Sequence, residues 1–293
     1  MTKDIGLAHV RAIAPYVGGR PISEVAREFG LDETKIVKLA SNENPLGMPE
    51  SAKKAMALAI ADLGRYPDSN GFELKNALAK KFAVPFEWIT LGNGSNDILE
   101  LTARAVAKEG DEVIFSKHAF AVYPLATQAV GAKAIEVPAK EYGHDLDAML
   151  AAVTSATRLI FVANPNNPTG TYLNRALLKT MLDKLRGRNI IVLLDYAYRE
   201  YARATDLPGP MEFYRDYPNL IVTGTFSKIY GLAGLRIGYI VAHPDVLKKV
   251  GKYGDTISPS QTALAAAKAS LGDEEFMKMT REKNAIARKV LTD

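Results

Sequence analysis

The sequence has no cysteine and only four histidines among its 293 residues. The absence of cysteine excludes disulfide bonds, thiolate metal sites and cysteine nucleophiles. The histidines lie far apart in the sequence and lack the spacing of metal ligands, so we expect no metal centre. These residues are His9, His118, His144 and His243.

Long apolar runs are also missing. No run approaches the length that crosses a bilayer, and the N-terminal residues include Lys3, Asp4 and Arg11 where a signal peptide has an apolar core. We therefore expect a cytosolic protein with no membrane segment. The net charge of +4 is a mild surplus without a clustered basic stripe, so nucleic acid is not an expected partner.

Short apolar runs alternate with amphipathic stretches along the chain. A continuous run such as Ile190–Leu194 is typical of a strand that is buried on both faces of a mostly parallel sheet. The alternation predicts an α/β fold with helices on both faces of the sheet. The predicted strands are Trp88–Leu91, Val113–Ser116, Ala134–Val137, Leu159–Val162, Ile190–Leu194, Leu220–Thr223 and Ile237–Ala242. The predicted helices are Ser51–Leu63, Ser95–Ala107, Asp145–Val153, Arg175–Leu185, Gln261–Leu271 and Asp273–Asp293.

A lysine follows one of these strands directly. The segment Thr225-Phe226-Ser227-Lys228 places Lys228 at the carboxyl end of a buried strand, where desolvation and nearby cations would lower the pKa of its amine. Such an amine is nucleophilic toward an aldehyde. The hydroxyls of Thr225 and Ser227, with the guanidinium of Arg236, suit a phosphate dianion. The alternative is a surface lysine in a loop.

An aspartate ends the most apolar run of the chain. Asp195, in Asp195-Tyr196-Ala197-Tyr198, would be desolvated and would need a partner, and a protonated pyridine nitrogen is one that fits. Tyr198 could donate a hydrogen bond to the phenolic oxygen of the same ring. The alternative is an aspartate that caps the helix after it.

Two turns add polar groups at other strand ends. Asn164–Gly170 contains two prolines and a glycine, which make a rigid turn able to fix an asparagine amide at a ring edge or beneath a carboxylate. Gly92–Asp97 puts glycines before a helix, where free backbone N–H groups attract an anion. This second segment could equally be ordinary helix capping. Ligands of open α/β sheets bind at such strand ends, and the four segments together supply groups for one cofactor.

These motifs resemble fold-type I pyridoxal-phosphate (PLP) enzymes of the class I/II aminotransferase family, and within it the histidinol-phosphate aminotransferases. The resemblance extends from about Ala14 to the end of the sequence. It rests on Ala14-Pro15-Tyr16, on the runs 39–45, 65–68 and 164–170, and on Phe226-Ser227-Lys228 with residues 231–236.

The resemblance implies a role for each matching residue. Lys228 would carry the cofactor and move the substrate proton, Asp195 would hold the ring nitrogen, and Tyr198 would assist in catalysis. The remaining cofactor-binding residues that it implies are Gly94, Ser95, Asn96, Phe120, Asn167, Thr225, Ser227 and Arg236, with Tyr66 contributed by a partner subunit. The substrate-binding residues that it implies are Tyr16, Asn42 and Asn167.

The resemblance also implies an activity and an assembly. We expect a homodimer with shared active sites that moves an amino group between histidinol phosphate and 2-oxoglutarate. The domains would be an arm with part of a small domain (1–45), a large PLP-binding domain (46–270) and the start of the rest of the small domain (271–293). One alternative is another PLP enzyme of this fold, such as an aromatic or other amino-acid aminotransferase, a decarboxylase or an oxidase. The other is a PLP-binding protein without turnover.

The sequence departs from the family pattern in two places. Tyr196 stands where the family usually has glutamate, one residue after the expected ring-nitrogen ligand. Family members also continue into a small-domain sheet that supplies an arginine for the substrate carboxylate, whereas this sequence ends at Asp293. We therefore expect a complete cofactor site and an incomplete substrate site.

Overall fold

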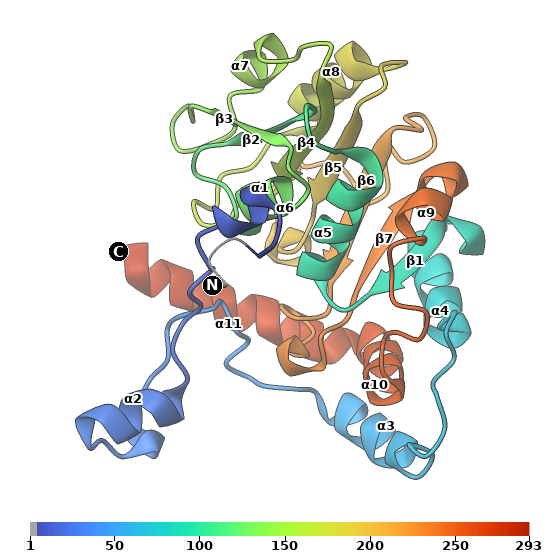
Figure 1. Cartoon of the computed structure of the whole chain (residues 1–293). Coiled ribbons are helices and arrows are strands. Elements are labelled where there is room, and N and C mark those ends of the chain that lie inside the picture. The colour runs from blue at the N-terminus through green and yellow to red at the C-terminus, as the bar shows by residue number, and fades with distance from the viewer. Residues whose placement is uncertain (1–4, 293) are drawn as a thin grey trace.

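The computed structural model describes residues 5–292. Its centre is one sheet of seven strands in the order β1-β7-β6-β5-β4-β2-β3 (Figure 1). All neighbouring strands are parallel except β7, which runs antiparallel to both β1 and β6. The strands are β1 (Ile89–Gly92), β2 (Glu112–Ser116), β3 (Lys133–Val137), β4 (Thr157–Ala163), β5 (Ile191–Asp195), β6 (Leu220–Thr225) and β7 (Gly238–Ala242).

Helices cover both faces of this sheet, which confirms the predicted fold class. The helices are α1 (Ala8–Arg11), α2 (Ile22–Phe29), α3 (Glu50–Ile60), α4 (Phe72–Phe82), α5 (Ser95–Val106), α6 (Val122–Ala129), α7 (Leu146–Ala151), α8 (Arg175–Leu185), α9 (Pro244–Val250), α10 (Gln261–Leu271) and α11 (Glu274–Thr292). Short 3-10 turns lie at η1 (Glu33–Lys35), η2 (Phe86–Trp88), η3 (Arg199–Tyr201) and η4 (Ala233–Leu235).

The alternation of side chains along each strand divides the core between the two faces. Phe161, Leu193 and Ile221 face α5, α6 and α9 in one apolar cluster. Their neighbours in sequence, such as Val192 and Val222, face the opposite way, toward α7 and α8. At the β1 and β7 end of that second face, the cluster continues beneath α4 and α10. The inner strands β4 to β7 are therefore positioned by burial on both sides, which fixes where their carboxyl ends lie.

All seven predicted strands are confirmed, each to within two residues at either end. Of the helices in the structure, α1, α2, α4, α6 and α9 were not predicted. Four of these, α1, α2, α6 and α9, have eight residues or fewer, too short to show a clear apolar period. Pro124 also interrupts the pattern of α6, although proline is tolerated near a helix start. The last residue of the predicted final helix, Asp293, lies outside the described residues.

The N-terminal arm extends away from the sheet. Figure 1 shows α2 standing apart from the main body, and Val17, Val37 and Leu39 are exposed. The division into parts 1–45, 46–270 and 271–293 stays a prediction. Within residues 5–292, no helix is both long and apolar enough to cross a membrane.

Candidate active site

Lys228 lies in the turn that follows β6. Its Nζ donates to the backbone carbonyl oxygens of Ser41 and Asn42, at 3.1 and 3.3 Å, and lies 5.4 Å from the ring centre of Tyr198. Burial, followed by the charge of Arg236, lowers the pKa of the Lys228 amine, although Glu43 and Asp195 act in the opposite direction. A lowered pKa leaves a larger fraction of the amine uncharged, which is the form that attacks an aldehyde.

The tripeptide Phe-Ser-Lys occurs twice in the chain, and each copy lies at the carboxyl end of a strand. Phe115-Ser116-Lys117 ends β2, but Lys117 is exposed. Lys228 is half-buried beside Tyr198, and the segment 41–44 lies against its turn. The alternative of a surface lysine in a loop therefore describes Lys117 and not Lys228.

Asp195 is the last residue of β5, and its side chain is buried. One oxygen accepts a hydrogen bond from the hydroxyl of Tyr123 at 2.9 Å, and the other accepts one from the backbone N–H of Ala197 at 3.0 Å. Burial raises the pKa of the Asp195 carboxyl, against the effect of both hydrogen bonds. No ion pair joins it to a cation among residues 5–292. A cationic ligand beside it would stabilise the ionised form.

The capping alternative for Asp195 explains only one of its two bonds. The contact with Ala197 is a local turn, and the next helical turn, η3, begins at Arg199. The contact with Tyr123 joins β5 to α6, and Tyr123 is itself fully buried and stacked on Phe161. Sequence reasoning did not assign a role to Tyr123, because a buried tyrosine in a short helix gives no signal of its partner.

A second group that sequence reasoning missed is the hydroxyl of Thr223. Thr223 pairs with Asp195 across β5 and β6, so both side chains point to the same face of the sheet. Its Oγ1 is buried and has no hydrogen-bond partner within the described part of the chain. Buried polar atoms normally have partners, so this hydroxyl favours a ligand or water beside Asp195.

Tyr198 lies between Lys228 and the N-terminal arm. Its hydroxyl accepts a hydrogen bond from Asn42 Nδ2 at 3.1 Å, and burial raises the pKa of Tyr198. Tyr16 is 59% exposed, and electrostatic repulsion from its phenolate would raise the pKa of Tyr198 further. Asn44 anchors the same segment of the arm through a hydrogen bond of 3.1 Å to the Ile229 carbonyl. The arm thus brings Asn42 to the lysine from distant sequence, and it places Tyr16 near enough to Tyr198 to affect its pKa.

The N-terminus of α5 and the turn after Lys228 form a cationic cup. Gly94 precedes α5 with φ +89°, and a Cβ at Gly94 would lie 2.5 Å from Arg236 Nη2, so the guanidinium lies against the helix start. Arg236 Nη1 donates to Ser227 Oγ at 3.4 Å, and Thr225 Oγ1 accepts from the Ser227 N–H at 3.1 Å. Ser95 and Asn96 form the first turn of α5, where backbone N–H groups lack helical partners. This arrangement suits a phosphate.

The remaining predicted ring contacts lie around this centre. The rigid turn after β4 contains cis bonds before Pro165 and Pro168, and Asn164 holds it through two hydrogen bonds with the backbone of Leu173. Asn167 is half-buried, and its amide forms no hydrogen bond within residues 5–292. Phe120 is half-buried, with its ring edge-on to Tyr123 at 5.9 Å.

Two tyrosines that the sequence singles out, a predicted cofactor contact and a departure from the family pattern, lie away from these groups. Tyr66 is 84% exposed and touches none of the predicted cofactor residues of its own chain. Tyr196 is buried in the cluster under α7 and α8, on the opposite face of the sheet from Asp195. The exchange of glutamate for tyrosine at that position therefore leaves the contacts of Asp195 intact.

The site combines three features within one edge of the sheet. A half-buried amine lies beside Tyr198, a buried carboxyl without an ion pair ends the neighbouring strand, and a cationic cup forms at Gly94 and Arg236. These residues fit a ligand that carries an aldehyde, a ring cation and a phosphate.

A comparison with protein families agrees with this ligand. The model of the family described as Aminotransferase class I and II matches residues 34–293. The chain belongs to the class I and II aminotransferases.

Other aminotransferases can be aligned with nearly the whole of this chain. Histidinol-phosphate aminotransferase 1 of Cupriavidus pinatubonensis is 57% identical over 98% of this chain and 76% of its own length. Histidinol-phosphate aminotransferase 2 of Ralstonia nicotianae is 56% identical over 100% of this chain and 78% of its own length. This aminotransferase therefore spans about three quarters of the length of these relatives.

Solved structures show the same fold. The crystal structure of histidinol-phosphate aminotransferase from Sinorhizobium meliloti, in complex with pyridoxal-5'-phosphate, has a TM-score of 0.89 and 30% identity over 98% of this chain and 76% of its own. Aspartate aminotransferase from Thermus thermophilus with maleate has a TM-score of 0.85 and 26% identity over 98% of this chain and 79% of its own.

Proposed function

We propose that this chain is a PLP-dependent aminotransferase that exchanges an amino group between histidinol phosphate and 2-oxoglutarate. The observation that carries the cofactor assignment is the buried Asp195, which has hydrogen bonds but no ion pair, on the strand next to the Lys228 turn. The substrate assignment is supported by relatives that are 56–57% identical and carry the name histidinol-phosphate aminotransferase.

The residues present fit PLP group by group. Lys228 would hold the aldehyde carbon, Asp195 the ring nitrogen, and Tyr198 with Asn167 the ring oxygen. Phe120 would lie against the ring. The residues that would hold the phosphate are Gly94, Ser95, Asn96, Thr225, Ser227 and Arg236. PLP, when bound, supplies an electron sink for the electrons released at the α-carbon of an amino acid.

The chain supplies the proton chemistry and the orientation. Lys228 Nζ, half-buried and with a lowered pKa, accepts the proton from the substrate α-carbon and returns one during the exchange. Asp195 stays ionised opposite a ring cation, and Tyr123 holds its carboxyl in place. Tyr198 and Asn42, joined by a hydrogen bond of 3.1 Å, orient the groups beside the amine, and Tyr16 borders the substrate.

A spectral titration tests the reaction and its substrate. The chain loaded with PLP is titrated with histidinol phosphate, phenylalanine and glutamate, and conversion of the aldehyde form of the cofactor to its amine form is followed by absorbance. We expect histidinol phosphate and glutamate to convert the cofactor, with 2-oxoglutarate reversing the change. Conversion by phenylalanine alone would favour an aromatic aminotransferase. PLP binding without conversion by any donor would contradict the proposed reaction and favour a PLP-binding protein without turnover.

Gly94→Ala should weaken PLP binding through the phosphate. The new Cβ would meet Arg236 Nη2 at 2.5 Å and displace the guanidinium, at a backbone φ of +89° that already disfavours alanine. Hydrogen bonds to charged groups contribute about 1.5–3 kcal/mol, so we expect a loss of about ten- to a hundredfold in PLP affinity.

The measurement compares PLP with pyridoxal, which lacks the phosphate. Gly94→Ala should change pyridoxal binding little. Gly110→Ala is the matched control, because Gly110 has a φ of +88° but no atom within 4 Å of its Cβ position. An equal loss for PLP and pyridoxal would show that Gly94 does not act through the phosphate.

We also propose that two chains share their active sites, with Tyr66 acting on the phosphate of the neighbouring subunit. Tyr66 follows α3, and Leu58, Ile60 and Leu63 near it are exposed as well. The arm adds further exposed apolar side chains, including Val17, Val37 and Leu39. Extensive exposed apolar surface of this kind marks a protein interface. Tyr66 then works from the partner, which explains why it has no role within its own chain.

Complementation tests this sharing. Lys228→Ala and Tyr66→Phe chains, each poorly active alone, are mixed under conditions that exchange subunits. In a two-fold dimer, each mixed dimer has one site with both lesions and one site with neither, so about a quarter of wild-type activity should return. If mixed dimers form and no activity returns, Tyr66 does not serve the partner's site.

A cytosolic location is the last part of the proposal. It is supported by the absence of cysteine, which leaves the chain without the disulfide bonds that are common in secreted proteins. Fractionation of cells that produce the chain, with an antibody to it, tests the location.

A further inference from the structure

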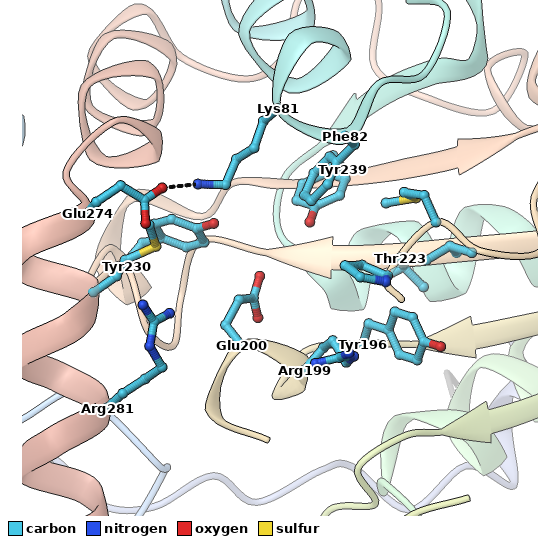
Figure 2. A pocket seen from close by; sticks show the side chains of 14 residues that line it. Lys81, Phe82, Tyr196, Arg199, Glu200, Thr223, Tyr230, Tyr239, Glu274 and Arg281 are labelled. Atoms are coloured by element: carbon cyan, nitrogen blue, oxygen red, sulfur yellow. Dashed lines mark hydrogen bonds and ion pairs between the residues drawn. The ribbon is translucent and has the colours of Figure 1, made fainter. Parts of the chain in front are cut away.

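A cavity of about 210 Å³ lies on the opposite face of the sheet from Asp195. It is enclosed by β6 and β7, the end of α4, the turn η3 and the first half of α11. Figure 2 shows the carboxyl of Glu200 near its centre, with Tyr230 and Tyr239 around it and Arg281 at one side. Apolar side chains such as Phe82, Met211 and Met277 complete the wall.

Glu200 is a carboxyl without a counter-ion in this cavity. No ion pair joins it to Arg281, Arg199 or any other cation of the described chain, although both arginines line the same cavity. Burial raises the pKa of Glu200 to about 7, because the attraction of Arg199, Lys81 and Arg281 only partly offsets the desolvation of its charge. A half-buried carboxyl without an ion pair is stabilised by a cation that pairs with it directly.

Other polar groups of the cavity also lack partners. The hydroxyl of Tyr230 is buried and has no hydrogen-bond partner within residues 5–292, and its residue is 1% exposed. Arg281, on α11, forms no ion pair with the acids in the part of the chain that is described. Lys81 and Glu274, by contrast, neutralise each other at 2.8 Å. The cavity thus contains one carboxyl and one guanidinium without an ion pair, those of Glu200 and Arg281, and the unpartnered hydroxyls of Tyr196 and Tyr230. Arg199 also forms no ion pair, but its guanidinium donates two hydrogen bonds to the Pro208 carbonyl.

We propose that this cavity binds a free α-amino acid as a zwitterion, at a site separate from Lys228. The ammonium group of the amino acid pairs with Glu200, and its carboxylate pairs with Arg281. The hydroxyl of Tyr230 forms a hydrogen bond with one of these two groups. A ligand with a single charge would leave one of the two protein charges unpaired. The apolar wall favours a neutral side chain on the ligand.

The size of the cavity supports a ligand of this class. Sites for drug-sized molecules occupy about 300–1,000 Å³, so 210 Å³ suits something smaller. Water alone could fill the space, but water would not neutralise Glu200 and Arg281. The site is also close to the proposed active site along the chain, because Glu200 is only two residues after Tyr198.

Binding is measured by calorimetry on the chain after borohydride reduction in the presence of PLP, which blocks Lys228. L-Valine is the probe, and isovalerate and isobutylamine are its analogues without the ammonium and without the carboxylate. We expect one saturable valine site per chain and at least about tenfold weaker binding of either analogue, or about 1.4 kcal/mol.

Variants then locate the bound valine. Glu200→Gln and Arg281→Gln should each weaken valine binding by at least about tenfold. Glu282→Gln and Arg288→Gln are the matched controls, since both residues are exposed on α11, and they should leave binding unchanged. Circular dichroism establishes that each variant is folded.

Three results would overturn the proposal. Valine that does not saturate the chain at its solubility limit would mean that the cavity holds water. Equal binding of all three probes would show that the two charges do not select the ligand. Valine binding that is unchanged in folded Glu200→Gln and Arg281→Gln chains would place the bound molecule elsewhere.

Discussion

Lys228→Ala should abolish covalent attachment of PLP and, with it, transamination. The half-buried amine beside Tyr198, with its lowered pKa, is the nucleophile that the site offers to an aldehyde, and alanine has no such group. The variant should still bind PLP through the cup around Arg236, so cofactor should be present but removable by dialysis. Borohydride reduction of the wild-type chain followed by peptide mapping should label Lys228.

Lys117→Ala is the control for this prediction. Lys117 has the same Phe-Ser-Lys context at the end of β2, but it is exposed. This variant should keep the label and the activity of the wild-type chain. A borohydride label at Lys117, or at any lysine other than Lys228, would show that the cofactor assignment is wrong.

Asp195→Asn should leave the fold intact and slow removal of the α-proton. An amide keeps the size of the carboxyl but cannot hold a ring cation, so the electron sink weakens. Hydrogen bonds to charged groups are worth about 1.5–3 kcal/mol, which corresponds to at least about a ten- to hundredfold loss of rate. The rate is measured in a single half-reaction with histidinol phosphate, and Asp216→Asn, at an exposed position, is the control.

The stability of the same variant provides an independent check on the fold. Burial raises the pKa of Asp195 in the chain without cofactor, so its ionisation opposes folding as the pH rises through the folded-state pKa. Asp195→Asn removes that ionisation, and the variant without PLP should melt at a temperature no lower than that of the wild-type chain at neutral pH. A low melting temperature would mean that a loss of activity reflects misfolding, while wild-type half-reaction rates in the folded variant would refute the role of Asp195.

The two predictions separate the cofactor from its chemistry. Lys228→Ala tests whether the amine carries PLP, and Asp195→Asn tests whether the buried carboxyl controls the reaction at the α-carbon. If Lys228→Ala loses covalent PLP but Asp195→Asn reacts at the wild-type rate, Lys228 carries the cofactor and the catalysis needs another explanation. Neither result depends on the cavity around Glu200, which lies on the other face of the sheet.

The sequence by itself determined the sheet and the residues at its edge. Apolar runs such as Ile191–Asp195 and Leu220–Thr225 are buried on both faces, so their pattern is local and strong. The polar groups at their ends, Asp195 and Lys228, follow directly from where the runs stop. Short helices such as α6 and α9 were not predicted, because fewer than three turns give too few apolar positions to define a period.

Only the tertiary structure decided which of these groups meet. It distinguished Lys228 from Lys117, because the burial of each lysine depends on what the arm and the neighbouring strands place above it. It joined Tyr123 to Asp195 across 72 residues of sequence, and it left the hydroxyl of Thr223 unpartnered beside them. Contacts between residues so far apart depend on strand order and helix placement, and these are fixed by packing of the whole core.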